Sequence, residues 1–195
     1  MNIVLKVVLS SVIGYLLGSI NSSLIIGRFY DIDIRTHGSG NAGVTNTLRT
    51  LGKTAAFLVL IGDILKGILS CLIGHYIAGE TGTIIAGASA IIGHNWPLYF
   101  GFKGGKGVLT SFAVVAYIDW KLALLALGAF IIIVSITRYV SLGSMVGAAI
   151  LPILTILFKR SIEFIIFTIV LGLLVIVKHR SNIERLINGF LSKLR

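Results

Sequence analysis

The chain has 195 residues, of which 56% are hydrophobic and 12% charged, and its mean hydropathy is +0.99. This apolar content argues against a water-soluble fold, because such a fold could not bury so much apolar surface. The 17 basic residues outnumber the 7 acidic ones and give a net charge of +10. Since the basic residues fall in short segments between apolar runs, we expect membrane topology to account for most of them, and no nucleic-acid partner.

Seven apolar segments, each limited by charge, Gly or Pro, predict membrane-spanning helices. They cover residues 3–28, 54–78, 82–100, 107–118, 121–137, 142–158 and 162–178. A bilayer core of about 30 Å needs about 20 helical residues for each crossing. The fourth segment is short and the third reaches Pro97, so six spans with one re-entrant segment is the alternative. Either pattern predicts one all-α integral membrane domain over residues 1–195.

The distribution of charge predicts the orientation of this domain. With seven spans the termini lie on opposite faces, and the positive-inside rule puts the more basic face in the cytoplasm. The more basic face carries Arg28, Arg35, Arg49, Lys53, Lys103, Lys106, Arg138, Lys178, Arg180, Arg185, Lys193 and Arg195, and the other carries Lys6, Lys121, Lys159 and Arg160. We therefore expect the N-terminus outside and the C-terminus in the cytoplasm. Every polar segment whose residues could bind a substrate or take part in catalysis then lies on the cytoplasmic side.

The first such segment, residues 31–49, follows the first predicted span. Its glycines let backbone amides turn toward one point, and its hydroxyl, amide and guanidinium groups offer hydrogen bonds and charge. This combination suits a phosphate group, although a polar interfacial loop is the plainer alternative. The spacing Gly38-x-Gly40-x-x-Gly43 also fits a dinucleotide fingerprint, but it follows no strand, so we reject that match. The candidate ligands are Gly38, Ser39, Gly40, Asn41, Thr45, Asn46 and Arg49, with Arg35 as a further charge.

A second segment, residues 93–107, has two lysines among four glycines in its last seven residues. Backbone amides and ammonium groups together make an anion cradle. A Walker A loop is unsupported, because the Gly-Lys pair comes one residue early. The candidate residues are Lys103, Gly104, Gly105, Lys106 and Gly107.

Two further features lie near these segments. Asp63 and Lys66 are three residues apart within the second predicted span, and charges at membrane depth either pair with each other or face a polar site, so mutual pairing and substrate contact both remain open. His179 and Asn182 follow the last span and share a face if that helix continues. Two phosphate-compatible segments on one side fit an enzyme with two phosphorylated reactants. The competing class is a transporter for phosphate or a phosphorylated solute.

The sequence closely resembles the bacterial acyl-phosphate-dependent glycerol-3-phosphate acyltransferases of the PlsY type, which act in phospholipid synthesis. The resemblance covers nearly the whole chain. It is carried by Gly18-Ser19, Asp31-Ile-Asp33-Ile-Arg35, Gly38-Ser39-Gly40-Asn41, Thr45-Asn46, Gly62-Asp63-x-x-Lys66-Gly67, Gly93-His94, Phe102-Lys103-Gly104-Gly105-Lys106-Gly107 and His179-Arg180-x-Asn182-Ile-x-Arg185. Asn21 departs from the family, which commonly has Pro there, and Phe190 stands near a position where the family has an acidic residue.

This resemblance implies a seven-helix enzyme of the bacterial cell (inner) membrane with a cytoplasmic active site. The enzyme would transfer a fatty acyl group from acyl phosphate to the 1-hydroxyl of glycerol 3-phosphate, releasing lysophosphatidic acid and inorganic phosphate, with no cofactor and no metal. Its partners would be the two substrates and membrane lipid, with functional links to the enzyme that makes acyl phosphate and to the next acyltransferase.

The resemblance also assigns roles to residues. It implies catalytic roles for Ser39, Lys106, His179 and Asn182; substrate or phosphate binding by Gly38, Gly40, Asn41, Thr45, Asn46, Arg49, Lys103, Gly104, Gly105, Gly107 and Ser144; and supporting roles for Asp63, Lys66 and His94. Because an acyl phosphate is already activated, no covalent enzyme intermediate is needed. The proton of the attacking alcohol could pass to His179 or to a phosphate oxygen of the substrate, and the sequence does not separate these.

Overall fold

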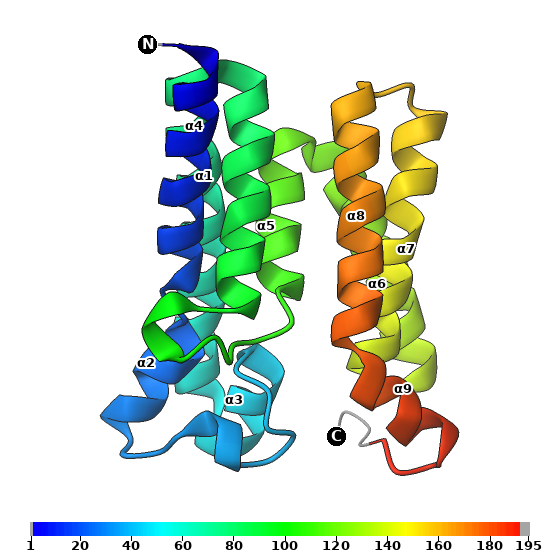
Figure 1. Ribbon diagram of the computed structural model, residues 1–195. Coiled ribbons are helices and arrows are strands. Elements are labelled where there is room, and N and C mark those ends of the chain that lie inside the picture. The colour runs from blue at the N-terminus through cyan, green and yellow to red at the C-terminus, as the bar shows by residue number, and fades with distance from the viewer. Residues whose placement is uncertain (1, 192–195) are drawn as a thin grey trace. The chain divides into compact units, whose positions relative to one another are not determined.

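A computed structural model of the chain describes residues 2–191, and all regular secondary structure in that range is helical (Figure 1). Lys193 and Arg195, which enter the charge count above, lie outside the described residues. The helices are α1 (Ile3–Ser19), α2 (Ser22–Phe29), α3 (Val44–Leu51), α4 (Lys53–Asn95), α5 (Val108–Ile118), α6 (Trp120–Thr137), α7 (Val140–Leu157), α8 (Ile162–Lys178) and α9 (Arg180–Ile187), with short 3-10 turns η1 (Ile34–Thr36) and η2 (Leu98–Phe100). They form two compact units, the first ending at Ile118 and the second beginning at Asp119.

Several of these helices are suited to lipid rather than to water. Within residues 2–191, four helical stretches are long and apolar enough to cross a membrane: Ile3–Phe29, Lys53–Phe100, Trp120–Thr137 and Val140–Leu157. A fifth is added if α8 and α9, which meet at a 54° bend, count as one span. Large apolar side chains such as Val8, Leu72 and Ile132 are exposed on them, as expected where lipid covers the surface.

The second and third predicted spans are the two arms of α4. Ala78 (φ −142°) and Gly79 (φ 61°) have non-helical backbone, and the chain reverses there. Across this break, a Cβ atom on Gly74, in the first arm, would collide with the backbone of Gly82, in the second arm. His75 and Thr83 share a hydrogen bond of 3.2 Å between Nδ1 and Oγ1. The break lies between the predicted segments 54–78 and 82–100, and the arms pack antiparallel.

The first predicted span is interrupted, which the apolar pattern did not indicate. The helix α1 ends at Ser19, and Asn21 begins α2 by accepting a hydrogen bond of 3.1 Å from the backbone N–H of Leu24. Asn and Ser favour helix starts because their side chains satisfy unpaired N–H groups. The polar run at Asn21 was the available signal for this break.

Small residues let α1 approach the second arm of α4. A Cβ atom on Gly14 would collide with the backbone of Ala86, and one on Gly18 with the backbone of Ala90. In lipid, helices associate by close packing rather than by hydrophobic burial, so small residues at such spacing define the contact. This contact fixes the end of α1 beside the end of α4.

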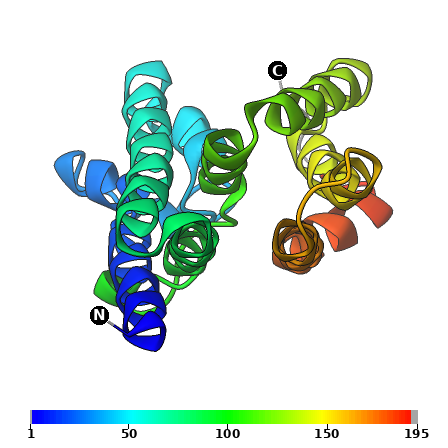
Figure 2. The same cartoon turned by 90° about the horizontal axis from the view of Figure 1, so that it is seen from above.

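Unit 2 contains the antiparallel helices α6, α7 and α8 (Figure 1; Figure 2). Thr155 and Thr168 share a hydrogen bond of 3.1 Å between α7 and α8. An ion pair of 2.6 Å joins Arg160, in the turn after α7, to Asp119 before α6. The predicted segments 121–137, 142–158 and 162–178 agree with these three helices within two residues at each end.

The close contact at Gly18 leads to a first prediction. Gly18→Leu should lower the free energy of unfolding by about 1–3 kcal/mol, because the new side chain overpacks the contact with Ala90. Titration with SDS in mixed micelles measures this loss. Gly128→Leu is the matched control, since a Cβ atom there meets open space, and its unfolding should stay close to that of the wild type. Equal losses in the two variants would contradict the packing argument.

Candidate active site

The first phosphate-compatible segment is held from inside by Asn46. The side-chain oxygen of Asn46 accepts a hydrogen bond of 2.8 Å from the backbone N–H of Ser39. Its Nδ2 donates to the carbonyl oxygens of Ile34 (3.0 Å) and His37 (2.9 Å). With 1% of its surface exposed, Asn46 serves the loop backbone, and the N–H of Ser39 turns toward this amide.

The same segment is partly helical, unlike the loop expected from its composition. Thr45, Asn46 and Arg49 lie on α3, which begins at Val44. Gly38 (φ 58°) and Gly40 (φ 73°) have left-handed backbone in the turn before it, a conformation that favours glycine. Ser39 and Asn41 are half-buried in this turn, and Arg49 is exposed.

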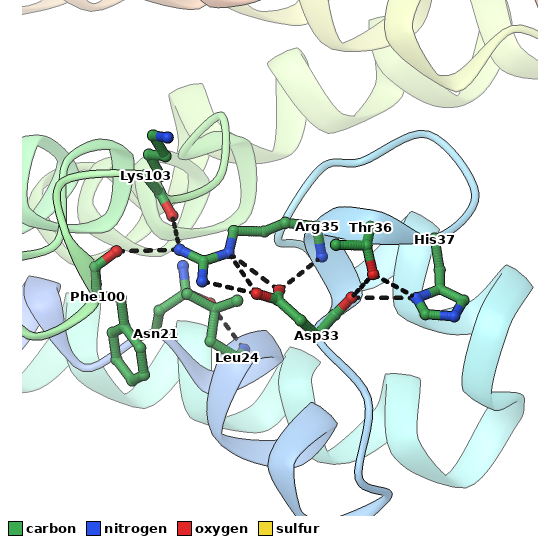
Figure 3. A network of polar contacts seen from close by, with 8 residues as sticks. All are labelled: Asn21, Leu24, Asp33, Arg35, Thr36, His37, Phe100 and Lys103. Carbon is green, nitrogen blue, oxygen red and sulfur yellow. Dashed lines mark hydrogen bonds and ion pairs between the residues drawn. The ribbon is translucent and has the colours of Figure 1, made fainter.

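Arg35 joins the first segment to the second (Figure 3). Its Nη1 donates to the carbonyl oxygens of Phe100 (3.0 Å) and Lys103 (3.3 Å). Its Nη2 makes an ion pair of 2.7 Å with Asp33, whose carboxylate also accepts from its Nε at 3.0 Å. The guanidinium is therefore engaged in connecting residues 33–35 to residues 100–103, whereas the sequence suggested charge for a phosphate.

This bidentate pairing shifts the titration of both groups. The hydrogen bonds from the Arg35 guanidinium hold the pKa of the Asp33 carboxyl below its usual value. In turn, the hydrogen bonds to the Asp33 carboxylate raise the pKa of Arg35. Both charges are thus stabilised at neutral pH, as is typical of charge-assisted fork geometry.

The second segment packs on the first at Gly105. A Cβ atom on Gly105 would collide with the carbonyl oxygen of Ala42 and with Nε2 of His94. The N–H of Gly105 donates to the carbonyl oxygen of His94 at 3.1 Å. Lys106 follows, half-buried, and Gly107 (φ 73°) leads into α5. The two segments that the sequence indicated separately therefore share one surface of unit 1.

Beneath this surface lies a buried polar network. Lys66 Nζ is 2.8 Å from the Asp63 carboxylate and 2.8 Å from Nδ1 of His94. It also donates to the carbonyl oxygen of Ile20 at 3.1 Å. Asp63 and Lys66 are 1% and 4% exposed, and they pair with each other, which is the first of the two alternatives that the sequence leaves open. The sequence reasoning missed Ser22, whose hydroxyl donates to Asp63 at 3.0 Å.

The remaining candidates lie in unit 2, at the end of the α7–α8 pair where α7 begins and α8 ends (Figure 1). Ser144 donates its hydroxyl to the carbonyl oxygen of Val140 at 2.8 Å. His179 is 3% exposed, and its Nδ1 lies 2.8 Å from the carbonyl oxygen of Val175. Because a carbonyl only accepts, the proton sits on Nδ1, and Nε2 carries the lone pair in the neutral ring.

The helix that carries the last predicted span does not continue straight through Asn182, which is the condition under which His179 and Asn182 would share one of its faces. The helix α8 ends at Lys178, and α9 leaves it at 54° with His179 as the joint. The N–H of Asn182 donates to the carbonyl oxygen of His179 at 2.8 Å, which turns the chain. The basic residues after Lys178 are compatible with a straight helix and with a bend. The sequence pattern therefore does not predict the bend at His179.

Fold and site together define a multi-pass integral membrane protein with two phosphate-compatible, glycine-rich segments joined at one end of its first unit. Among residues 2–191, no group of three or more His, Cys, Asp or Glu side chains is placed to hold a metal ion.

Comparison with known proteins narrows this class. The family model for glycerol-3-phosphate acyltransferase matches residues 8–189. The glycerol-3-phosphate acyltransferase of Thermoanaerobacter sp. (strain X514) is 46% identical over 188 residues, which are 96% of this chain and 95% of that protein. That of Clostridioides difficile (strain 630) is 46% identical over 189 residues, covering 93% of this chain and 92% of the relative.

Solved structures agree. The crystal structure of PlsY (YgiH), an integral membrane glycerol 3-phosphate acyltransferase, in its glycerol 3-phosphate form matches with a TM-score of 0.92 at 34% identity, over 97% of this chain and 96% of that one. The lysophosphatidic acid form matches with a TM-score of 0.89 at 34% identity, over 97% and 95%. The chain belongs to the PlsY-type glycerol-3-phosphate acyltransferase family.

The pairing of Asp33 with Arg35 predicts a dependence of stability on pH. Because its folded pKa is lowered from 3.8, the unfolded chain takes up this proton first as the pH falls. The stability that Asp33 adds is therefore present above about pH 4 and is lost as the pH falls toward the folded pKa. Thermal unfolding in detergent from pH 6 to pH 2.5 measures this for the wild type and Asp33→Asn.

The gap between the two melting temperatures should be widest near pH 6 and should close below pH 4. Asp31→Asn is the matched control, since Asp31 is an exposed aspartate two residues earlier. A gap between Asp33→Asn and the wild type that stays constant across this range would contradict the role of the carboxylate charge.

Proposed function

We propose that this membrane enzyme transfers a fatty acyl group from acyl phosphate to the 1-hydroxyl of glycerol 3-phosphate, the first step of phospholipid synthesis. The products are lysophosphatidic acid and inorganic phosphate. The observation that carries the proposal is the joining of two phosphate-compatible segments through Arg35 and through the contact of Ala42 with Gly105. Two phosphorylated reactants need two places for phosphate, and the joined segments offer both on one surface.

The chemistry asks for positioning more than for covalent catalysis. The hydroxyl oxygen of glycerol 3-phosphate attacks the acyl carbonyl carbon, the bond from that carbon to the phosphate oxygen breaks, and the alcohol loses its proton. Alignment of the alcohol with the carbonyl lowers the barrier. Positive charge and oriented donors stabilise the charge that develops on the carbonyl oxygen and on the departing phosphate.

In unit 1 we assign the phosphates to the two glycine-rich segments. Lys106 stabilises charge on the departing phosphate, and Ser39 and Arg49 bind phosphate from the first segment. We assign the remaining phosphate contacts to Gly38, Gly40, Asn41, Thr45, Lys103, Gly104, Gly105 and Gly107. Asn46 acts through the loop backbone, which its hydrogen bonds to Ser39 and His37 support.

In unit 2 we assign Ser144 to phosphate binding and His179 with Asn182 to catalysis. His179 Nε2 is suited to accept the proton of the alcohol, because Nδ1 is held as a donor by the carbonyl oxygen of Val175. A phosphate oxygen of the donor is the competing base. That the family model extends over residues 8–189, and so over both units, supports one functional domain.

We further propose seven spans, with the N-terminus outside and the C-terminus and the active site on the cytoplasmic side of the bacterial inner membrane. The break in α4 supports two crossings from this helix, and α5, with 11 residues, is the short span. In unit 1, the segments at 31–49 and 93–107 lie at the end opposite the N-terminus (Figure 1). The basic residues of these segments favour the cytoplasm for that end.

The reaction also implies its neighbours in a sequence of reactions. An acyl phosphate must be supplied by an enzyme that makes it, and lysophosphatidic acid, which keeps a free hydroxyl, must pass to a second acyltransferase. Membrane lipid is the medium through which both apolar molecules reach and leave the enzyme.

The direct test is turnover by the purified protein in lipid. Palmitoyl phosphate with glycerol 3-phosphate should yield inorganic phosphate and lysophosphatidic acid in equal amounts, whereas palmitoyl-CoA should not serve as donor. Lys106→Ala should lower kcat by about 100-fold or more, as expected for loss of a charge that stabilises the transition state. Lys121→Ala, at the start of α6 and exposed, is the matched control and should keep wild-type rates.

Absence of turnover from folded protein with either donor would contradict the acyltransferase proposal. Phosphate uptake into liposomes would then test the competing transporter.

A pH–rate profile separates the two candidate bases. If His179 accepts the proton, kcat in the wild type should rise with pH along a limb that His179→Gln removes, with a loss of about 100- to 10,000-fold in rate. His75→Gln is the matched control, because His75 lies at the end of the first arm of α4, next to its break. This variant should keep the limb. A limb that persists in His179→Gln assigns the proton to a phosphate oxygen of the donor.

A further inference from the structure

We propose that Lys66 is a positioning residue that sets the place of the Gly104–Gly107 segment, and thereby of Lys106, through His94. The inference rests on the proposed function, because it concerns how that reaction's phosphate site is held. It starts from the ammonium group of Lys66, which is 4% exposed and is surrounded by protein acceptors.

Three hydrogens of the ammonium meet three acceptors. Lys66 Nζ lies 3.1 Å from the carbonyl oxygen of Ile20, 2.8 Å from Asp63 Oδ1 and 2.8 Å from His94 Nδ1. A lysine has three N–H donors and no acceptor, so these partners use its full capacity. The three acceptors come from the end of α1, the first arm of α4 and the second arm of α4. Lys66 thus ties three helical segments at one point.

This arrangement fixes the chemical form of His94. Because the ammonium donates to Nδ1, that nitrogen must accept, and the neutral ring carries its hydrogen on Nε2. The Asp63 carboxylate balances the ammonium charge and also accepts from Ser22 at 3.0 Å. The imidazole therefore has one orientation and one tautomer as long as Lys66 donates to it.

The glycine segment rests on this oriented histidine. The N–H of Gly105 donates to the carbonyl oxygen of His94 at 3.1 Å. A Cβ atom on Gly105 would collide with His94 Nε2, and one on Gly104 with the His94 carbonyl oxygen. Both the backbone and the ring of His94 thus touch the residues just before Lys106. A shift of this histidine would move the segment, because no side chain intervenes.

A need for stability alone does not explain the buried charges. Replacing a buried ion pair by neutral groups of similar volume is often neutral or stabilising, whereas removing one partner is strongly destabilising. The ion pair of Asp63 and Lys66, with the hydrogen bonds of Lys66, has a second consequence. It fixes the position of His94, against which the Gly104–Gly107 segment packs. Stability and positioning can therefore be separated by removing both charges together.

The test uses the double variant Asp63→Asn with Lys66→Met in the full-length protein. It should fold, with a melting temperature within a few degrees of the wild type, because no unpaired charge is left. Backbone amide hydrogen exchange of residues 101–107 should rise, and the KM for palmitoyl phosphate and the inhibition constant of inorganic phosphate should increase about 10- to 100-fold. A purely structural loss would lower the active fraction, and hence kcat, and leave these two constants unchanged.

Thr83→Val is the matched control. It removes the hydrogen bond to His75 that joins the same two arms at their other end, and it should leave exchange at residues 101–107, KM and the inhibition constant as in the wild type. Ser22→Ala is a milder second variant, which keeps Lys66 and loses one hydrogen bond to Asp63. It should raise KM about two- to fivefold and serves if the double variant fails to fold.

Gly105→Ala perturbs the same contact from the side of the segment. If Lys66 acts through His94 and Gly105, adding Gly105→Ala to the double variant should cost much less than the product of the two separate effects. Unchanged exchange and unchanged KM in a folded, active double variant would overturn the proposal. Absence of turnover in the wild type would instead overturn the proposed function, whereas the exchange measurement would still report on the segment.

Discussion

Close backbone contact at glycine is the constraint on which unit 1 depends. Lipid gives helices no hydrophobic reason to associate, so they hold together where small residues permit near approach. Gly18 on α1 and Gly74 on the first arm of α4 make such contacts with the second arm. These contacts bring the end of α1 and both arms together around Lys66. At the end of unit 1 opposite the N-terminus, Gly105 makes a similar close contact with the backbone of Ala42, which joins the two phosphate-compatible segments.

Polar groups inside this unit follow the same constraint. In the bilayer core they find no water, and each must be satisfied by protein. Lys66, within α4, therefore meets three acceptors. Outside the spans, the buried Asn46 likewise uses both ends of its amide on the loop backbone. The consequence is that several polar residues of the candidate site serve the scaffold. Lys103 and Lys106, in contrast, lie in the segment that this scaffold supports.

Much of this architecture could be predicted from the sequence, for definable reasons. Long apolar runs such as 121–137 and 162–178 coincide with α6 and α8, because membrane helices are specified by local hydropathy. The interruption of the first span at Asn21 and the 54° bend at His179 were missed, since short polar residues occur both inside and between helices. Pairings across the chain, such as Arg35 with Phe100, leave no periodic signal. For this reason the sequence suggests Arg35 only as a further charge for phosphate.

The contacts of Arg35 with Asp33 and Phe100 suggest that arginine and lysine have different tasks in this protein. A donor that is already activated needs no nucleophile, so the rate depends on where two phosphates and one hydroxyl are held. Guanidinium groups are suited to holding carbonyl and carboxylate oxygens in fixed directions, because their donors form a rigid planar fork. An ammonium can instead follow the charge that moves onto a departing phosphate. The use of Arg35 between Asp33 and Phe100 agrees with the first part of this division, and the role that we propose for Lys106 corresponds to the second.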